Sequence, residues 1–392
     1  MGLLNIFLYS LLPLFVVGNI FRLEIREGIF VNLLDLGIIA LLPISVYYLT
    51  LNKNALRKNP FFKYLTVFLA AILLSLLVNI FTLDSKTALI AILYFLRLFA
   101  FFQLIFIFSL LTKNFRKRFL NFLSFSIGLT AILGLMQYFL YDNLRNLEYL
   151  GWDVHQYRVF STFLDPNFAG VIFLMGLFII ISNLKKYSSK MKKTSFVLFF
   201  IEAIAVFLTY SRTAYVTLLV TSSIYISKFR KIYIIIPLSF LIFGVLLLPK
   251  DLKSEGVNLA RTASIQARIQ ENSEGINVFF EHPIFGIGYN AYRAYNPRAE
   301  SKFPENAASG IPNSYILTLS TTGVIGFVAL IYLCIGVYKF ISKIKSPEDK
   351  TLITTLSLIL LSSALFENTM YYNYIIFVYF SALGIVSAKE NS

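Results

Sequence analysis

Most of this chain consists of long apolar runs that are separated by short polar connectors. Twelve runs have the length of a membrane span or nearly so, at residues 3–21, 29–51, 60–82, 87–112, 118–141, 166–184, 194–210, 212–227, 232–249, 312–338, 351–367 and 369–387. A bilayer offers the backbone no hydrogen-bond partners, so each run is predicted to be a helix. The pattern predicts an all-α polytopic membrane protein with about twelve transmembrane helices. The two runs that meet at Ser211 and Arg212 also fit one long bent helix.

Two connectors are long enough to fold over the membrane surface, at 142–165 and at 250–311. The second is the long polar stretch between the ninth and tenth runs. Long connectors are where function concentrates. We therefore divide the chain into N-terminal transmembrane helices (1–141), a core that includes the outer loop 250–311 (142–338), and C-terminal transmembrane helices (339–392).

Composition supports an integral membrane protein, because the chain is 57% hydrophobic and 14% charged, with a mean hydropathy of +0.73. Soluble domains carry about 25% charged residues. If the N-terminus is cytoplasmic, the inner connectors hold 20 Lys and Arg against 3 Asp and Glu. The positive-inside rule then predicts that both termini are cytoplasmic and that 250–311 is extracytoplasmic.

The net charge of +15 does not indicate a nucleic-acid partner, because the basic residues are scattered among short connectors. A nucleic-acid interface would gather them on one soluble face. The single cysteine, Cys334, lies within an apolar run and provides no disulfide framework. The two histidines, His155 and His282, are far apart in the sequence, so no metal site is predicted.

Residues 158–170 combine an arginine with a predicted helix start. Pro166 suits the first turn of a helix and Asp165 suits its N-cap. Arg158 would then lie just above the membrane, near a helix N-terminus that favours anions. A surface loop with a solvated arginine is the alternative.

Arg212 lies in a very short outer turn, where other connectors avoid positive charge. Its guanidinium has a planar set of donors that matches phosphate oxygens. An arginine that anchors two helix ends at the interface would give the same pattern.

Residues 262–281 are predicted to form an amphipathic helix whose apolar face contains Ile265, Ile269, Ile276, Phe279 and Phe280. Such a helix can lie flat on the membrane with Arg268 reaching a cleft. A surface pair of Arg268 with Glu271 is the alternative. Pro283 would end the helix, and Gly286 and Gly288 would permit a tight structural turn.

Three charged residues fall inside apolar runs, where charges are usually paired or functional. They are Asp35, Arg97 and Glu202. Arg97 is predicted to pair with Asp35 or with Glu202, in a structural role or in a proton or ion relay.

Together these motifs resemble the O-antigen ligase and O-antigen polymerase family of bacterial envelope glycosyltransferases. The resemblance runs from about residue 158 to residue 326, and the predicted topology extends it over nearly the whole chain. The matching positions are residues 158–167, 211–212, 268, 283–288, 313–319 and 323–326.

The resemblance implies an inverting glycan transfer that needs no metal or other cofactor, at the outer face of the bacterial cytoplasmic membrane. The implied partners are an undecaprenyl-diphosphate-linked oligosaccharide donor, a glycan or lipid-glycan acceptor, and membrane lipids. Arg212 and Arg268 match the family arginines that hold the diphosphate, and Arg158 matches a further one. Asn313 and Tyr315 are expected to line the acceptor side.

The sequence departs from the ligase pattern at Pro312, which stands where ligases have a histidine that activates the acceptor hydroxyl. Ser161 stands where glycine is common. His282 is expected to be structural, and Glu305 or Asn313 could lie near the acceptor. No catalytic residue is therefore assigned, and the polymerase or a divergent branch is favoured over a lipid A–core ligase. A transporter or flippase, or a non-catalytic binder of lipid-linked oligosaccharides, remains the alternative.

Overall fold

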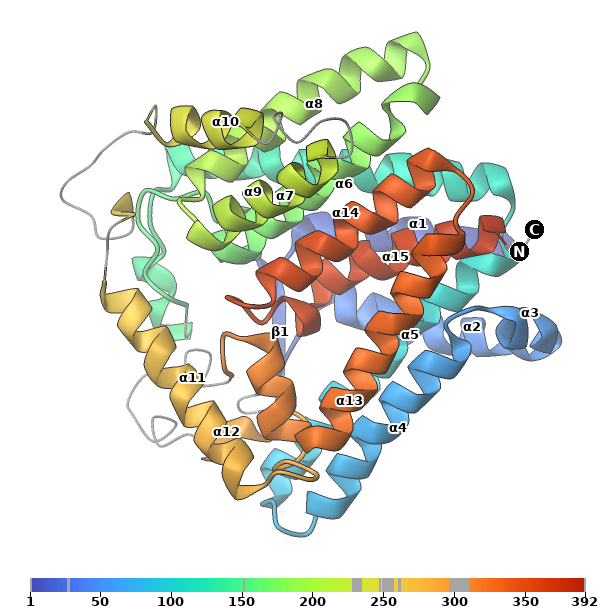
Figure 1. The fold of residues 1–392 in the computed structure, drawn as a ribbon, viewed down its shortest axis with the longest axis vertical. Coiled ribbons are helices and arrows are strands. Elements are labelled where there is room, and N and C mark those ends of the chain that lie inside the picture. Colours follow the sequence, from blue (N-terminus) through green and yellow to red (C-terminus); the bar gives the residue numbers. More distant parts are fainter. Residues whose placement is uncertain are drawn as a thin grey trace.

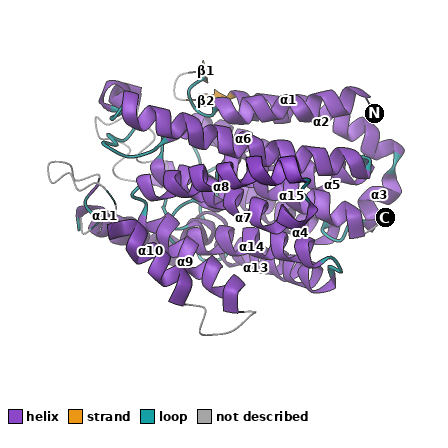
Figure 2. Ribbon diagram, turned by 90° about the horizontal axis from the view of Figure 1, so that it is seen from above, coloured by secondary structure: helices purple, strands orange, loops and turns teal. Residues whose placement is uncertain are grey.

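The computed structural model describes residues 2–26, 29–150, 152–227, 235–246, 248, 257–259, 262–295 and 310–390. These residues form a bundle of helices (Figure 1). The two termini and helix α3 (Lys53–Lys58) lie at one end of the bundle, and helix α11 (Ala263–Glu281) lies at the opposite end, in both views (Figures 1 and 2). This arrangement is compatible with the predicted orientation, in which α11 is extracytoplasmic and the termini are cytoplasmic.

Every predicted apolar run corresponds to a helix. These helices are α1 (Gly2–Val17), α2 (Leu33–Leu51), α4 (Phe62–Asn79), α5 (Ser85–Ile107), α6 (Lys113–Leu140), α7 (Pro166–Asn183), α8 (Ser189–Leu208), α9 (Arg212–Ser227), α10 (Ile235–Leu246), α13 (Ser314–Lys343), α14 (Pro347–Ser363) and α15 (Asn373–Glu390). Within the described ranges, six helices are long and apolar enough to cross a membrane, and others are shorter. The chain is thus a helical membrane protein, and the number of about twelve spans stays a prediction.

A short β-hairpin between α1 and α2 was not predicted. Strand β1 (Arg22–Arg26) pairs antiparallel with β2 (Ile29–Asn32), with Arg22 opposite Asn32. Asn32 also caps α2, because its side chain accepts a hydrogen bond from the backbone N–H of Asp35 at 3.0 Å. The hairpin therefore holds Arg22 above the start of α2.

Helix α7 lies at the centre of the bundle, and 78% of its spanning window is buried. It packs against α6, α8, α9 and α14. Next to its N-terminal end, an aromatic cluster joins Phe15 to Phe163 and Tyr374, with ring centroids 5.7 and 5.9 Å apart. The beginning of α7 is therefore supported from both terminal segments of the chain.

Helices α8 and α9 are separate, and the alternative of one long bent helix is wrong. Tyr210 adopts a left-handed conformation, with φ of 49°, which breaks the helical path after Leu208. The next helix starts at Arg212, and the Ser211 hydroxyl accepts a hydrogen bond from the N–H of Ala214 at 3.3 Å. At this junction the buried Thr209 and Tyr210 carbonyls accept hydrogen bonds from the side chain of Arg158.

The segment after α11 forms the expected tight turn, which packs on a kink in α13. Gly286 and Gly288 have positive φ values of 64° and 101°, and Gly323 in α13 has φ of 65°. The Ile287 N–H donates to the Ser320 carbonyl at 3.1 Å and the Gly288 N–H to that of Thr321 at 3.0 Å. The turn thereby attaches the end of α11 to α13.

Candidate active site

The three arginines singled out from the sequence line one cavity of about 460 Å³. Arg158 comes from the loop before α7, Arg212 from the first residue of α9, and Arg268 from the middle of α11. We call this space the arginine cavity. Its polar lining also includes Asp153, His155, Asp165, Asn167, Thr213, Ser264, Glu271, Glu367 and Asn368.

Arg158 is buried, so the alternative of a solvated surface arginine is wrong. Its Nε donates to the Thr209 carbonyl at 2.7 Å, and its Nη2 donates to the Asn167 Oδ1 at 3.2 Å. The guanidinium thus joins the break between α8 and α9 to the first turn of α7. Asp165 caps that turn as predicted, accepting from the N–H groups of Asn167 and Phe168 at 2.7 and 3.2 Å.

Arg212 reaches from α9 toward the outer helix. Its Nη2 donates to the Ser264 hydroxyl of α11 at 2.6 Å. The side chain therefore lies in the arginine cavity and does not only anchor helix ends at the interface.

Arg268 forms an ion pair with Glu367, which lies between α14 and α15. Its Nη1 also donates to the Phe366 carbonyl at 2.6 Å. The Thr213 hydroxyl lies 3.5 Å from the same Glu367 oxygen. Glu271, the partner considered from the sequence, lines the cavity as well. The ion pair thus joins α11 to the loop between α14 and α15 at the wall of the cavity.

Two carboxyl groups in the cavity hold protons more strongly than usual. Burial raises the pKa of Glu367 to about 7, and this effect outweighs the attraction of Arg268, which lowers it. Burial also raises the pKa of Asp165, although the backbone N–H groups of Phe168 and Asn167 and the charge of Arg158 oppose the shift. The cavity therefore offers both fixed positive charge and a carboxyl group that titrates near neutral pH.

Glu367 was missed in the sequence, and Asp165 was noted only as a helix cap. The available signal was position: Glu367 is the last residue of the apolar run 351–367, at the end predicted to face outward. A carboxylate at such a boundary is ordinarily solvated. Only its burial, with 7% of the residue exposed, distinguishes it.

The structure does not place Asn313 and Tyr315 on the cavity wall, whereas Pro312 lines it. Asn313 is the N-cap of α13, and its Nδ2 donates to the Leu365 carbonyl at 3.0 Å. The Tyr315 hydroxyl donates to the Leu361 carbonyl of α14 at 2.9 Å. Both side chains attach the start of α13 to α14 and to the loop after it, and their place on the acceptor side stays a prediction.

The sequence analysis also named His155, His282 and Glu305, and the structure describes the two histidines. The ring of His282 packs edge-to-face near Tyr295, with centroids 5.8 Å apart, which agrees with a structural role. His155 lines the arginine cavity, a position that the sequence did not suggest. Glu305 lies outside the described residues.

Of the charges inside apolar runs, Arg97 and Asp35 form the predicted pair, with Nη1 and Oδ2 3.6 Å apart. Glu202 is not part of this pair. Its two carboxylate oxygens are buried and have no hydrogen-bond partner in the described part of the chain.

The fold and the cavity define a helical membrane protein with a polar cavity, lined by three arginines and four carboxyl groups, next to α11. A family model described as O-antigen ligase matches residues 194–331, from α8 into α13, and so includes Arg212, Arg268 and the glycine turn. This match supports the O-antigen ligase/polymerase family as the family of the chain. None of the curated proteins that were compared matches it.

Proposed function

We propose that this protein is a metal-independent, inverting glycosyltransferase that joins an undecaprenyl-diphosphate-linked glycan to an acceptor glycan. The observation that carries the proposal is the gathering of Arg158, Arg212 and Arg268 on one cavity. The family match supports the same class of reaction and lipid-linked glycan substrates in general.

In the proposed reaction an acceptor hydroxyl attacks the anomeric carbon from the face opposite the diphosphate. The bond from that carbon to the diphosphate oxygen breaks, and the leaving diphosphate takes the electron pair. Arg212 and Arg268 would stabilise this growing charge more in the transition state than in the bound donor. Arg158 would mainly position Asn167 and the start of α7, because its donors already bond the Thr209 and Tyr210 carbonyls.

We propose Glu367 as the base that accepts the hydroxyl proton. It is buried beside Arg268, and its pKa of about 7 suits proton transfer at neutral pH. The position at which ligases carry a histidine is Pro312, which cannot accept a proton but lines the same cavity. Binding of the diphosphate would compete for Arg268, whose charge lowers the pKa of Glu367, and would therefore raise this pKa and make the carboxylate a stronger base.

The site is proposed to face the outside of the bacterial cytoplasmic membrane, with both termini in the cytoplasm. The polymerase branch is favoured, in which the acceptor is a second lipid-linked repeat unit, because the ligase histidine is replaced. Attachment to lipid A–core sugars is the competing product. The two differ in the number of repeat units joined.

The test uses the purified full chain in lipid nanodiscs with undecaprenyl-diphosphate-linked oligosaccharide as both donor and acceptor. We expect release of undecaprenyl diphosphate and a ladder of lengthened glycans on a gel, in the presence of a metal chelator. A single added block on lipid A–core acceptor would indicate the ligase branch. No turnover of any donor with either acceptor would contradict the proposal.

Transport of the same lipids is a second candidate, favoured by Glu202. This carboxyl lies within α8, fully buried and without a hydrogen-bond partner among the described residues. Such a group could carry a proton. Proton-coupled movement of lipid-linked sugar across vesicles, abolished in Glu202→Gln and without glycan product, would support transport instead.

A further inference from the structure

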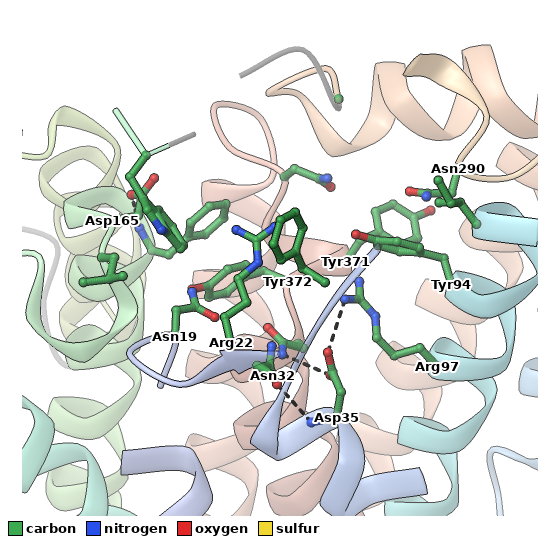
Figure 3. A pocket seen from close by; sticks show the side chains of 18 of the residues that line it. Asn19, Arg22, Asn32, Asp35, Tyr94, Arg97, Asp165, Asn290, Tyr371 and Tyr372 are labelled. Carbon is green, nitrogen blue, oxygen red and sulfur yellow. Dashed lines mark hydrogen bonds and ion pairs between the residues drawn. The ribbon is translucent and has the colours of Figure 1, made fainter. Parts of the chain in front are cut away.

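A second cavity of about 360 Å³ adjoins the arginine cavity and is lined on one side by the β-hairpin (Figure 3). The hairpin, α2, α5, the loop before α7 and the loop after α14 all contribute to its wall. We call it the hairpin cavity. The two cavities are adjacent, because Asp153, His155, Asp165, Phe168, Gly310 and Asn368 line both of them.

The charges of the hairpin cavity are balanced, with three arginines and three aspartates in its lining. The guanidinium of Arg97 is held by Asp35 at 3.6 Å and lies 4.2 Å from the centroid of the Tyr94 ring. The Asn373 Nδ2 donates to the Oδ1 of Asp35 at 3.1 Å, whereas Arg97 pairs with its Oδ2. Arg97 and Asp35 neutralise each other, and the lining as a whole has equal numbers of arginines and aspartates. The cavity therefore suits a polar ligand without a strong net charge.

Aromatic faces form another part of the wall. Phe168 and Tyr372 stack in parallel, with centroids 3.9 Å apart and planes within 4°. The Arg22 guanidinium lies 3.9 Å from the centroid of Phe30 and 5.5 Å from that of Trp152. Flat aromatic surfaces next to polar groups match sugar rings, which present C–H faces and hydroxyl edges.

Asparagine side chains supply hydrogen-bonding groups that the protein does not fully use. The Asn368 Oδ1 is buried and has no hydrogen-bond partner within the described residues. A buried acceptor normally has a donor, and Asn368 stands on the wall that the two cavities share. Asn290 also lines the hairpin cavity. A hydroxyl group of a ligand would satisfy Asn368.

We propose that the hairpin cavity binds the sugar rings of an uncharged, hydroxyl-rich oligosaccharide. This inference rests on the proposed function, because the sugars would extend from the diphosphate in the arginine cavity. Two sources share this chemistry: the glycan of the lipid-linked donor and the glycan of the acceptor.

The chain provides its own reporter, because Trp152 is its single tryptophan and lines the hairpin cavity. The probe is the free oligosaccharide repeat unit released from the producing cell's surface polysaccharide, added to the full chain in nanodiscs. We expect a saturable change in tryptophan emission. Inorganic pyrophosphate should bind the wild type in a calorimetric titration and should not bind Arg212→Ala. The same variant should keep the change in tryptophan emission with the oligosaccharide.

Two variants test the amide contacts. Asn368→Ala removes the unsatisfied acceptor, and Asn290→Gly removes an amide while glycine tolerates its left-handed backbone, with φ of 58°. Each should raise the half-saturating oligosaccharide concentration about tenfold, the loss of one good hydrogen-bonding group. Unchanged saturation in both folded variants, or no response in the wild type, would overturn the proposal.

A competition experiment identifies the source of the sugars. If the donor glycan occupies the hairpin cavity, undecaprenyl-diphosphate-linked oligosaccharide will displace the free oligosaccharide. If the acceptor occupies it, both will bind together. Pyrophosphate binding without an oligosaccharide response would overturn this inference alone. Pyrophosphate that binds Arg212→Ala as well as it binds the wild type would instead count against the proposed function.

Discussion

The guanidinium of Arg268 pairs with the carboxylate of Glu367, which lies 99 residues further along the chain. The pair joins the outer helix α11 to the loop between α14 and α15. Arg268 also donates to the Phe366 carbonyl, so the contact has two attachment points. The same side chains line the arginine cavity, and changes to them should therefore affect both catalysis and attachment of the outer helix.

Replacing Arg212 by alanine should reduce glycan transfer by about 10²- to 10³-fold, the loss typical of one transition-state donor. Arg212→Lys should retain part of the activity, since lysine keeps the charge but not the planar donors. Arg57→Ala, in the short helix α3 at the opposite end of the bundle, is the matched control. The measurement is undecaprenyl diphosphate release in nanodiscs. Full activity of Arg212→Ala would contradict the role of this cavity.

Arg158→Ala should lower stability as well as activity. It removes the hydrogen bonds to the Thr209 carbonyl and to Asn167, leaving a buried carbonyl without this donor, at a cost of about 1–3 kcal/mol. Arg212→Ala should change the unfolding temperature little, because its hydrogen bond is to the Ser264 hydroxyl of α11. Thermal unfolding in detergent compares the two. Equal unfolding temperatures would show that Arg158 does not hold the junction.

Arg268 and Glu367 should show coupled effects in a double-mutant cycle. Arg268→Ala leaves the buried carboxyl group of Glu367 without its cation. Glu367→Gln removes the negative charge that pairs with Arg268. The double variant should then be more stable than the sum of the single changes, by about 1 kcal/mol. Additive changes in the free energy of unfolding would mean that the pair contributes nothing to stability.

Transfer should rise with pH through about 7, because Glu367 must be deprotonated to accept a proton. Glu367→Gln should be slow at every pH and lack this rise. An unchanged pH profile in that variant would exclude Glu367 as the base.

Stability should have the opposite pH dependence. The pKa of Glu367 in the folded state is raised above its ordinary value of 4.5. The protonated carboxyl group therefore makes its full contribution to the free energy of unfolding when the pH is below 4.5. The contribution is lost as the pH rises through about 7. Wild-type unfolding temperature should therefore fall over this window relative to that of Glu367→Gln.

Gly286→Ala should destabilise the attachment of α11 to α13 by about 2 kcal/mol or more. A Cβ there would lie 2.4 Å from the Thr321 carbonyl carbon, at a φ of 64°. Gly310→Ala is the control for thermal unfolding, since its Cβ would meet only the Asn368 amide at 3.8 Å. Similar unfolding temperatures for the two variants would contradict the tight packing of the turn.

The positions of the helices followed from the sequence, because burial in lipid or in a helical core requires long apolar runs, and these are local. The Asp165 cap and the glycine turn were also predictable, since capping and positive φ depend on neighbouring residues. The cost of isolated charge in the membrane predicted a carboxylate partner for Arg97, but only the structure selected Asp35 over Glu202. The β-hairpin was missed because β1 is only five residues long and β2 is an apolar segment at the start of the run 29–51, which was predicted to be a helix.

The composition of the cavity depended on packing between segments far apart in the chain. Glu367 reaches Arg268 because α14 returns the chain to α11, and no local pattern records that approach. Asn313 and Tyr315 point toward α14 for the same reason: the carbonyls of Leu365 and Leu361 come within hydrogen-bonding distance only after the helices pack. Local hydrophobic pattern thus placed the helices, whereas helix packing selected the side chains that meet.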